Sequence, residues 1–542
     1  MNSAAPIRSR AAEEGGFQIP LWGIPLVLLL LYVCLFSGLG ALGLLGPDEP
    51  RYAAIARSMA ETHDWVTPRL WGTPWFEKPV LYYWLAGIAM RLFGVSEFAA
   101  RLPSALAALL AVAAIKWAAL RSYGLGAAWF SLLMLPASVA MIGFSHAASP
   151  DMLFAGLLAA AMAAALEILQ TPRPGPIARI AFGFFLGAAV LAKGPAAVVL
   201  AGGATLLWAA FVRQWQTPFR FLHPLIVAVF CATALPWYIL CALRNPDFLR
   251  VFIWQHNFER YLTPVFQHPQ PFWFYAPVLA AALFPWTVIP AGLLFTKWER
   301  QGWQDSPGMF ILCWALFPFL FFSFSQSKLP GYILPAVPPA FLLLSRAASH
   351  LFASGRLRPA ISLGFTGALV ALAASASART LGMDGRLYNV PGARVLGLVG
   401  LAIAGGVIAM LFSAMKRPGQ AFAAVVLVVA VLVAYMIVDI LPFANPTLSA
   451  RNLARESFVQ NPSGNNVAVY AIPREWSYGL NYYFGRELPE WKGAGPPPEW
   501  LFTSKLNGIK LLHPGDQIYG MTGRAAAGAV LLHLQPSGEK PH

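Results

Sequence analysis

The stretch GPDEPRYAAIARSMAETHDWVTPRLWGTPWFEKPVLYY, residues 46–83, decides the fold of this chain. It is the first long polar stretch after the first hydrophobic segment, and it holds five of the 23 acidic residues among 542. Two tight charged clusters, Asp48-Glu49 and Glu77-Lys78, are each bracketed by prolines. Carboxylates beside apolar segments are costly to desolvate, so acids held at rigid positions indicate a functional site. A solvated loop is the alternative interpretation.

The composition around this stretch is that of a polytopic membrane protein. Hydrophobic residues make up 58% of the chain, charged residues 11%, and the mean hydropathy is +0.59. The length leaves room for about a dozen membrane spans and one soluble domain. The net charge of +15 is explained by Lys and Arg in cytoplasmic loops and by anionic lipid headgroups. No nucleic-acid motif or basic run is present, so we expect membrane lipids and no nucleic acid as partners.

Hydrophobic runs set the expected number of spans. The run 19–45 is too long for a signal-peptide core and is predicted to be a retained first span. The run 79–94 is short, so we assign it to an interfacial helix. With the first span, about 13 spans are expected from the length rule. The others lie near 101–120, 124–144, 151–170, 177–192, 195–213, 219–242, 271–296, 307–325, 331–351, 358–378, 393–414 and 419–441.

The positions of Lys and Arg predict the topology. With the N-terminus inside, every even-numbered connection is cytoplasmic, and each carries two or more basic residues, as the positive-inside rule requires. The opposite face then receives the polar motifs, which are far apart in the sequence. We therefore predict one extracytoplasmic site built from the segments 46–100, 145–151, 193–195, 243–270, 327–332 and 379–392, next to everything after about 442.

The end of the chain has a different composition. Pro, Gly and Asn turns separate two strand-like segments, 465–472 and 529–534. We predict a transmembrane domain over 1–444 and a small α/β extracytoplasmic domain over 445–542. The four cysteines lie in or beside apolar runs without ligand spacing, which indicates neither a disulfide framework nor a thiolate metal site.

The outer face of a membrane lacks nucleotide sugars, so a sugar donor there must arrive activated on a lipid phosphate. Recognition of that phosphate needs cations. Five cations lie on the predicted outer face, which the positive-inside rule leaves poor in positive charge: Arg51, Lys78, Lys193, Arg260 and Lys328. Taken singly, each could instead be a side chain that reaches from a helix end to the interface.

Glycosyl transfer passes through an oxocarbenium-like transition state that carboxylates stabilise. The candidate acids are Asp48, Glu49, Glu77 and Asp151. Glu77 and His256, in WQHNFERYL, could together bind a divalent cation such as Zn, Mg or Mn, although their spacing is not diagnostic and a hydrogen-bonded histidine is an equal alternative.

The motifs together resemble those of the polyprenyl-phosphate-dependent GT-C glycosyltransferases, the protein mannosyltransferase-like superfamily. The similarity is greatest to the bacterial group that transfers aminoarabinose to lipid A. The motifs are GPDEPRYA (46–53), FEKPVLYYW (76–84), SPD (149–151), AKGP (192–195), QHNFERY (255–261) and SKLPGYILP (327–335). One departure is Val80, where many relatives have a second proline.

This resemblance implies a GT-C fold of 13 spans with periplasmic juxtamembrane helices and a C-terminal periplasmic domain, in the bacterial inner membrane. It also implies roles for individual residues. Asp48 is expected to be the catalytic carboxylate, with Asp151 and Glu49 as further acids. Lys78, Arg260, Tyr332, Lys328 and Arg51 are expected around the donor phosphate, and Glu77 with His256 as metal ligands.

The expected reaction is an inverting transfer of 4-amino-4-deoxy-L-arabinose from undecaprenyl phosphate to a phosphate of lipid A, by a monomer. Transfer of another sugar, or transfer to a protein or to lipopolysaccharide, is the alternative within this class. A lipid transporter or flippase is the alternative from another class. It would require ionisable residues near mid-membrane and inverted repeats, and the sequence shows neither.

Overall fold

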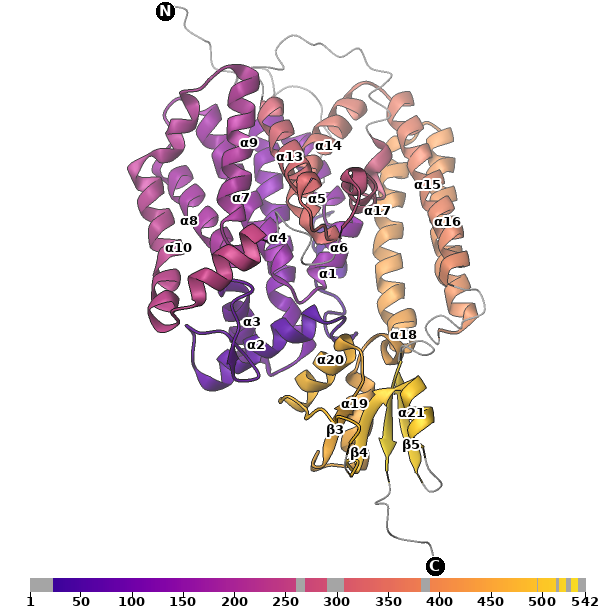
Figure 1. Ribbon diagram of the computed structural model, residues 1–542. Coiled ribbons are helices and arrows are strands. Elements are labelled where there is room, and N and C mark those ends of the chain that lie inside the picture. The colour runs from indigo at the N-terminus through magenta and orange to yellow at the C-terminus, as the bar shows by residue number, and fades with distance from the viewer. Residues whose placement is uncertain are drawn as a thin grey trace, which may run out of the picture.

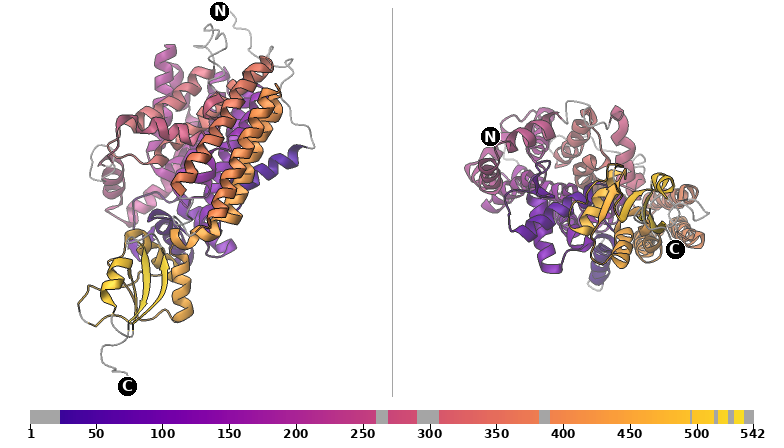
Figure 2. Two further views of the ribbon diagram at one scale, coloured as in Figure 1. Left: turned by 90° about the vertical axis from the view of Figure 1, so that its right-hand side faces the viewer. Right: turned by 60° about the horizontal axis from the view of Figure 1, so that its bottom comes forward.

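A computed structural model shows a bundle of long helices with a small sheet domain at one end (Figure 1). It describes residues 23–259, 269–289, 307–381, 390–494, 496–512, 516–522 and 528–534. The sheet domain projects from one end of the helical bundle, and a view turned by 90° shows the same arrangement (Figure 2). The polar stretch 46–83 contacts the C-terminal domain, because Arg57 donates to the carbonyl of Tyr482 at 3.2 Å.

Within the described ranges, nine helical segments are long and apolar enough to cross a membrane, which makes this a multi-pass membrane protein. The bent pair α5 (Leu125–Met134) and α6 (Val139–Ser145), with an angle of 56°, would make a tenth. Shorter apolar helices are α1 (Ile24–Leu35), α3 (Leu81–Phe93), α9 (Ala196–Val212) and η6 with α12 (Phe272–Ala282). The nine are α4 (Glu97–Tyr123), α7 (Pro150–Gln170), α8 (Pro176–Lys193), α10 (Pro224–Arg244), α13 (Pro307–Phe324), η8 with α14 (Pro330–Ala353), α15 (Leu357–Leu381), α16 (Gly392–Ala414) and α17, η9 and α18 together (Pro418–Leu448).

Local sequence signals explain where the helices that carry the site begin and end. Ser96 and Ser149 cap α4 and α7 with their hydroxyls, and Pro150 occupies the first turn of α7, where its missing N–H costs no hydrogen bond. Gly124 and Gly194 end α4 and α8 with φ of 88°, a conformation that glycine adopts without strain. These ends fix where Asp151 and Lys193 emerge from the bundle.

Helix α7 runs through the centre of the bundle and is buried along almost its whole length. Its alanines and Gly156 let α4 approach closely, since a side chain at Gly156 would meet the carbonyl of Ala107 at 2.4 Å. Small residues at such contacts are typical of helix packing in membranes. The helix that carries Asp151 is therefore held rigidly on all sides.

The polar stretch forms α2 (Asp48–Thr62), the short strands β1 (Arg69–Leu70) and β2 (Thr73–Pro74), and then α3. Helices α2 and α3 lie at the end of the bundle beside the sheet domain (Figure 1). The 13-residue α3 covers most of the predicted interfacial helix 79–94. In the predicted loop 243–270 the structure instead has a π-helical segment, η4 (Arg250–Glu259), anchored by stacking of Phe248 on Phe252.

The C-terminal domain is a four-stranded mixed sheet with helices. The strand order is β3-β4-β6-β5, with β3 and β4 parallel and the other pairs antiparallel. Both predicted strands are present, as β3 (Val467–Tyr470) and β6 (Ala529–His533). The sequence did not indicate β4 (Trp500–Ser504), which follows a proline-rich turn, or β5 (Gln517–Thr522), which contains a glycine and a register shift. The helices are α19 (Arg451–Gln460), α20 (Arg474–Phe484) and α21 (Lys505–Leu511). The boundary predicted at 444 falls within α18 (Leu441–Leu448) and remains a prediction.

Candidate active site

Asp48 stands at the first position of α2, where it is more exposed than the charged residues around it. Gly46, with φ of 59°, turns the chain into the helix. The side chain of Asp48 is 56% exposed, and one of its oxygens, Oδ1, accepts from Nη2 of Arg51 at 2.6 Å. Asp48 therefore presents an exposed carboxylate that Arg51 orients.

Arg51 connects this carboxylate to the second acidic motif. Its guanidinium is buried, and Nη1 lies 3.0 Å from Oε2 of Glu77. It also lies over the rings of Tyr52 and Trp75, at 5.1 and 5.5 Å from their centroids. The planar fork of an arginine can hold two acceptors at fixed positions. Arg51 thus ties the DEPR and FEKP motifs into one cluster.

Glu77 lies between two cations, because Nζ of Lys78 is 3.5 Å from its Oε1. A metal ion at Glu77 would compete with Arg51 and Lys78 for the same two oxygens. Nearby, the hydroxyl of Tyr83 is buried without a hydrogen-bond partner among the described residues. Burial and, second to it, Glu77 raise the pKa of Tyr83, so its hydroxyl stays protonated as a donor.

The predicted metal site rests partly on His256, whose side chain lies outside the described residues, as does the whole of Arg260. Among the residues that are described, no group of three His, Cys, Asp or Glu side chains could hold a metal ion. The surroundings of Glu77 fit an ion pair better than a metal ligand.

A second cluster forms around Asp151, at the N-terminus of α7. Lys193, at the last position of α8, forms an ion pair with Asp151, and Ser149 Oγ donates to its Oδ2 at 3.3 Å. The ring of Tyr332, from η8 (Pro330–Ala336), lies with its centroid 4.8 Å from the Lys193 ammonium. Lys193 and, to a smaller extent, Lys78 lower the pKa of Asp151 against the effect of burial, which raises it. Three of the segments predicted to form the site, 145–151, 193–195 and 327–332, therefore meet at this cluster.

Gly331 lets the SKLPGY turn approach this cluster. A side chain built there would meet the ring of Phe144 at 3.0 Å and Oδ2 of Asp151 at 3.5 Å. In the same turn the buried Lys328 donates to the carbonyls of Gln270 at 3.0 Å and Ser325 at 2.6 Å. Burial lowers the pKa of the Lys328 ammonium from its ordinary value. Within the described residues, its recorded partners are carbonyls and not carboxylates, so its charge is not neutralised there.

Glu49 has a different environment from its neighbour Asp48. It is buried, and Nη2 of Arg101 donates to its Oε2 at 2.7 Å. Its oxygens also accept from the backbone N–H groups of Leu45 at 2.8 Å and Ala148 at 2.7 Å. Arg101 belongs to none of the sequence motifs, although an arginine in an Ala-rich apolar helix requires such a partner. Both acids were predicted site residues, and the structure separates an exposed one from a buried one.

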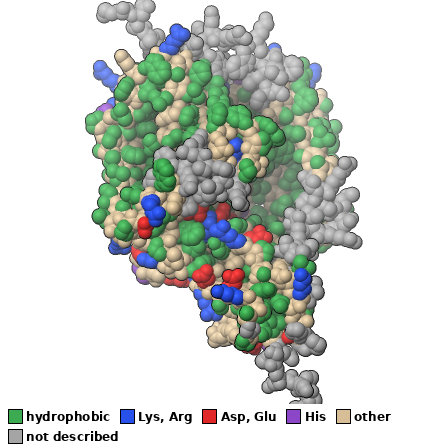
Figure 3. Space-filling model, in the orientation of Figure 1, with side chains coloured by type: hydrophobic (Ala, Val, Ile, Leu, Met, Phe, Trp, Pro, Cys, Tyr) green, Lys and Arg blue, Asp and Glu red, His purple; other side chains and the backbone are tan. Residues whose placement is uncertain are grey.

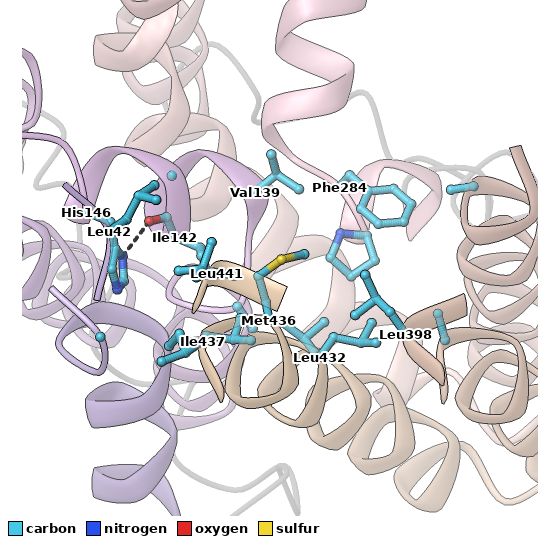
Figure 4. A pocket seen from close by; sticks show the side chains of 18 of the residues that line it. Leu42, Val139, Ile142, His146, Phe284, Leu398, Leu432, Met436, Ile437 and Leu441 are labelled. Carbon is cyan, nitrogen blue, oxygen red and sulfur yellow. Dashed lines mark hydrogen bonds between the residues drawn. The ribbon is translucent and has the colours of Figure 1, made fainter. Parts of the chain in front are cut away.

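An apolar cavity of about 550 Å³ lies beside this buried pair. Its walls come from α6, α15, α16 and α17 and from the segment 36–45, and Glu49 and Arg101 form its polar end. Figure 4 shows Leu42, Ile142 and His146 on one side and Leu432, Met436 and Leu398 on the other. A cavity of this size and lining accommodates hydrocarbon.

Charge is distributed unevenly over the surface. Hydrophobic side chains cover the flanks of the bundle, and Lys, Arg, Asp and Glu gather at its lower end and around the sheet domain (Figure 3). Both clusters described above belong to α2, the loop before α3, and the ends of α7 and α8 that meet them. The arrangement is that of a polar site at one edge of a membrane-embedded bundle.

The chain is similar to glycosyltransferases of known families. A family model described as dolichyl-phosphate-mannose-protein mannosyltransferase matches residues 22–252. The chain is 34% identical over 357 residues to an undecaprenyl phosphate-α-4-amino-4-deoxy-L-arabinose arabinosyl transferase of Aeromonas salmonicida, covering 63% of this chain and 62% of that one. It is 30% identical over 471 residues to the undecaprenyl phosphate-α-4-amino-4-deoxy-L-arabinose arabinosyl transferase 2 of Pseudomonas fluorescens, covering 84% of this chain and 79% of that one.

Among solved structures, the fold matches that of ArnT from Cupriavidus metallidurans, crystallised with undecaprenyl phosphate. The TM-score is 0.75 at 24% identity, over 97% of this chain and 100% of that chain. This likeness confirms the helical GT-C fold.

Proposed function

Because the chain belongs to the family of the undecaprenyl phosphate-α-4-amino-4-deoxy-L-arabinose arabinosyl transferases, we propose that it transfers this sugar from undecaprenyl phosphate to a phosphate of lipid A. The transfer would take place at the periplasmic face of the bacterial inner membrane, in a monomer with 13 spans. The observation that carries the proposal is the exposed carboxylate of Asp48, oriented by the buried Arg51, which Glu77 joins to Lys78.

In the proposed reaction, an oxygen of the acceptor phosphate attacks the anomeric carbon of the sugar. The bond from that carbon to the donor phosphate oxygen breaks, and the electron pair leaves with undecaprenyl phosphate. Attack from the opposite face inverts the configuration. The acceptor phosphate is already ionised near neutral pH, so no strong general base is needed. Asp48 would then stabilise positive charge on the sugar, more than it would remove a proton.

The cations are assigned to the donor phosphate. Lys78 and Lys328 supply charge from two different loops, and the predicted Arg260 would add a third cation. Arg51 fixes the orientation of Asp48, and Tyr332 belongs to the turn that would close over the donor. Asp151 orients Lys193, with which it is paired. Glu49, with all its recorded contacts to buried donors, is proposed to hold α2 in place and not to touch the sugar.

The apolar cavity supports lipid substrates. It adjoins the segment that leads into Asp48, and we propose that it receives an acyl chain of the acceptor. The polyprenyl chain of the donor would lie elsewhere, on the side of Lys328 and Tyr332.

The experiment is mass spectrometry of lipid A from a deletion strain that carries this gene, its Asp48→Asn variant or an empty vector. We expect the mass of an added aminopentose only with the intact gene, with equal protein levels for the variant. Unmodified lipid A in all three strains, with the donor lipid shown to be present, would contradict the substrate assignment. It would point to another sugar or to a protein acceptor.

A further inference from the structure

A second pocket, of about 310 Å³, lies where the C-terminal domain meets the bundle. We call it the junction pocket, and its principal lining residues are Arg57, Glu97, Arg451, Arg455, Tyr482 and Tyr483. They come from α2, α4, α19 and α20, so the pocket exists only when the two domains are joined. Three guanidinium groups face one lining carboxylate, which gives the pocket a net positive charge.

Several donors in the junction pocket have no partner among the described residues. Nε of Arg451 and the hydroxyl of Tyr482 are buried and make no hydrogen bond there, and Tyr482 is only 3% exposed. Arg455 is exposed, and the described structure records no hydrogen bond or ion pair for it. A buried donor without a partner is costly, about 1–3 kcal/mol, and in a native protein indicates a missing ligand or water.

The remaining groups hold the pocket in shape. Arg57 donates to Glu61 at 2.6 Å and to the carbonyl of Tyr482 at 3.2 Å, next to Gly485, which leaves room for its guanidinium. Glu97 accepts from the hydroxyl of Tyr483 at 2.9 Å and lies 3.4 Å from Nη1 of Arg451. These bonds fix the positions of the residues that carry the unpaired donors.

The junction pocket and the apolar cavity share one wall. Arg451 donates from the pocket side to the carbonyls of Gly40 and Ala41, at 2.9 and 2.6 Å. Arg101 donates from the cavity side to the carbonyls of Leu39 and Gly43 in the same segment, 36–45. Glu97 and Arg101 are one turn apart on α4, about 6 Å along its axis. A lipid could place an acyl chain on one side of this segment and an anionic headgroup on the other.

We propose that the junction pocket binds a phosphate of the lipid acceptor other than the one that reacts. Arginine-lined sites with additional hydroxyl donors are suited to phosphate. Arg57 lies nine residues after Asp48 in α2, about 13 Å along the helix axis, so a phosphate bound there is not the one at Asp48. The identity of the lipid rests on the proposed function. The C-terminal domain then serves to select acceptors with a second phosphate.

The test measures transfer by the full chain in nanodiscs, with bis-phosphorylated and monophosphorylated lipid A as acceptors. Arg455→Gln is expected to raise the KM for the bis-phosphorylated acceptor about tenfold, the effect of one charge-assisted hydrogen bond, without changing kcat or the donor KM. Tyr482→Phe is expected to raise the same KM without lowering Tm, because its hydroxyl has no described protein partner. Neither variant should change the KM for the monophosphorylated acceptor. Arg474→Gln, an exposed charge on α20 outside the pocket, is the control.

The inference is overturned if the wild-type protein does not distinguish the two acceptors, or if both variants leave their KM values unchanged. The inference is also overturned if the pocket binds bulk phospholipid or free phosphate. In the first case, phosphatidylglycerol in the nanodisc would reproduce the rise in KM. In the second case, inorganic phosphate would compete equally with both acceptors. Native mass spectrometry of the same two lipids on the protein separates these results from failure of the proposed function. If neither acceptor is modified but the bis-phosphorylated form still binds more tightly through Arg455, only the transfer assignment fails.

Discussion

Arg101 and Glu49 form a buried ion pair, with Nη2 2.7 Å from Oε2, one residue away from the exposed Asp48. Removing one partner of a buried pair leaves an uncompensated charge, which costs about 3–5 kcal/mol. We therefore expect Glu49→Ala to destabilise the protein by that amount and to lower its yield, as measured by thermal unfolding in detergent. Asp48→Asn should keep the wild-type Tm and lose transfer. Equal Tm values for the two variants would contradict the division of roles.

Arg51 holds two acceptors at once, Asp48 at 2.6 Å and Glu77 at 3.0 Å. A lysine keeps the charge but cannot present two fixed donors. Arg51→Lys is expected to lower kcat at least tenfold, because Asp48 loses its orientation, with a smaller change in the donor KM. Steady-state kinetics with donor and acceptor varied separately would show this. Arg91→Lys, an exposed arginine on α3 to which no role in the site is assigned, is the control, and a kcat loss as large in that variant would contradict the prediction.

The contrast between Asp48 and Glu49 shows how much of the site the sequence could predict. The positive-inside rule placed six separate segments on one side, and the structure brings Asp48, Glu77, Lys78, Asp151 and Tyr332 to one end of the bundle. Residue type and spacing could not distinguish Asp48 from Glu49. The two acids differ because Glu49 pairs with Arg101, which lies 52 residues further along the chain. The junction pocket was equally out of reach. It depends on how α19 and α20 dock on α2 and α4, and no local pattern encodes that docking.

The FEKP motif predicts that Lys78 binds the donor phosphate. Nζ of Lys78 lies 3.5 Å from Oε1 of Glu77, and 14% of the side chain is exposed. Its removal leaves Glu77 paired with Arg51, so we expect the fold to tolerate Lys78→Ala. Donor affinity should fall about tenfold, as expected for one charge-assisted hydrogen bond. Binding of undecaprenyl phosphate to the detergent-solubilised protein measures it. Lys492→Ala, an exposed lysine of the C-terminal domain, controls for net charge, and an unchanged Kd for Lys78→Ala would remove its phosphate role.

Gly331 sets how closely the SKLPGY turn approaches Asp151. A methyl group there would meet Phe144 at 3.0 Å and Asp151 at 3.5 Å, so the turn or the ring must shift. Gly331→Ala should cost about 1–3 kcal/mol of stability from overpacking and lower kcat, because Tyr332 moves with the turn. Gly175→Ala, where nothing lies within 4 Å of the added atom, is the control. A wild-type kcat for Gly331→Ala would show that the position of the turn does not matter for transfer.

The lowered pKa of Lys328 predicts how donor affinity and stability change with pH. Burial lowers the pKa of its ammonium below the ordinary value of 10.5, so the folded protein loses this proton at a lower pH than the unfolded chain does. Donor affinity, which needs the charge, should fall as the pH rises through the lowered pKa. Stability should change in the opposite direction, because between the two pKa values the unfolded state binds more protons and the free energy of unfolding rises with pH.

Arginine stays charged over this range, so Lys328→Arg should lack both trends. Donor Kd and Tm, each measured from neutral to alkaline pH for the wild type and the variant, separate this group from others that titrate in the same range. Lys328→Met should bind the donor weakly at every pH without the alkaline decline, which keeps the test valid if the arginine does not fit. Parallel alkaline declines in the wild type and in both variants would show that Lys328 does not carry the charge that the donor needs.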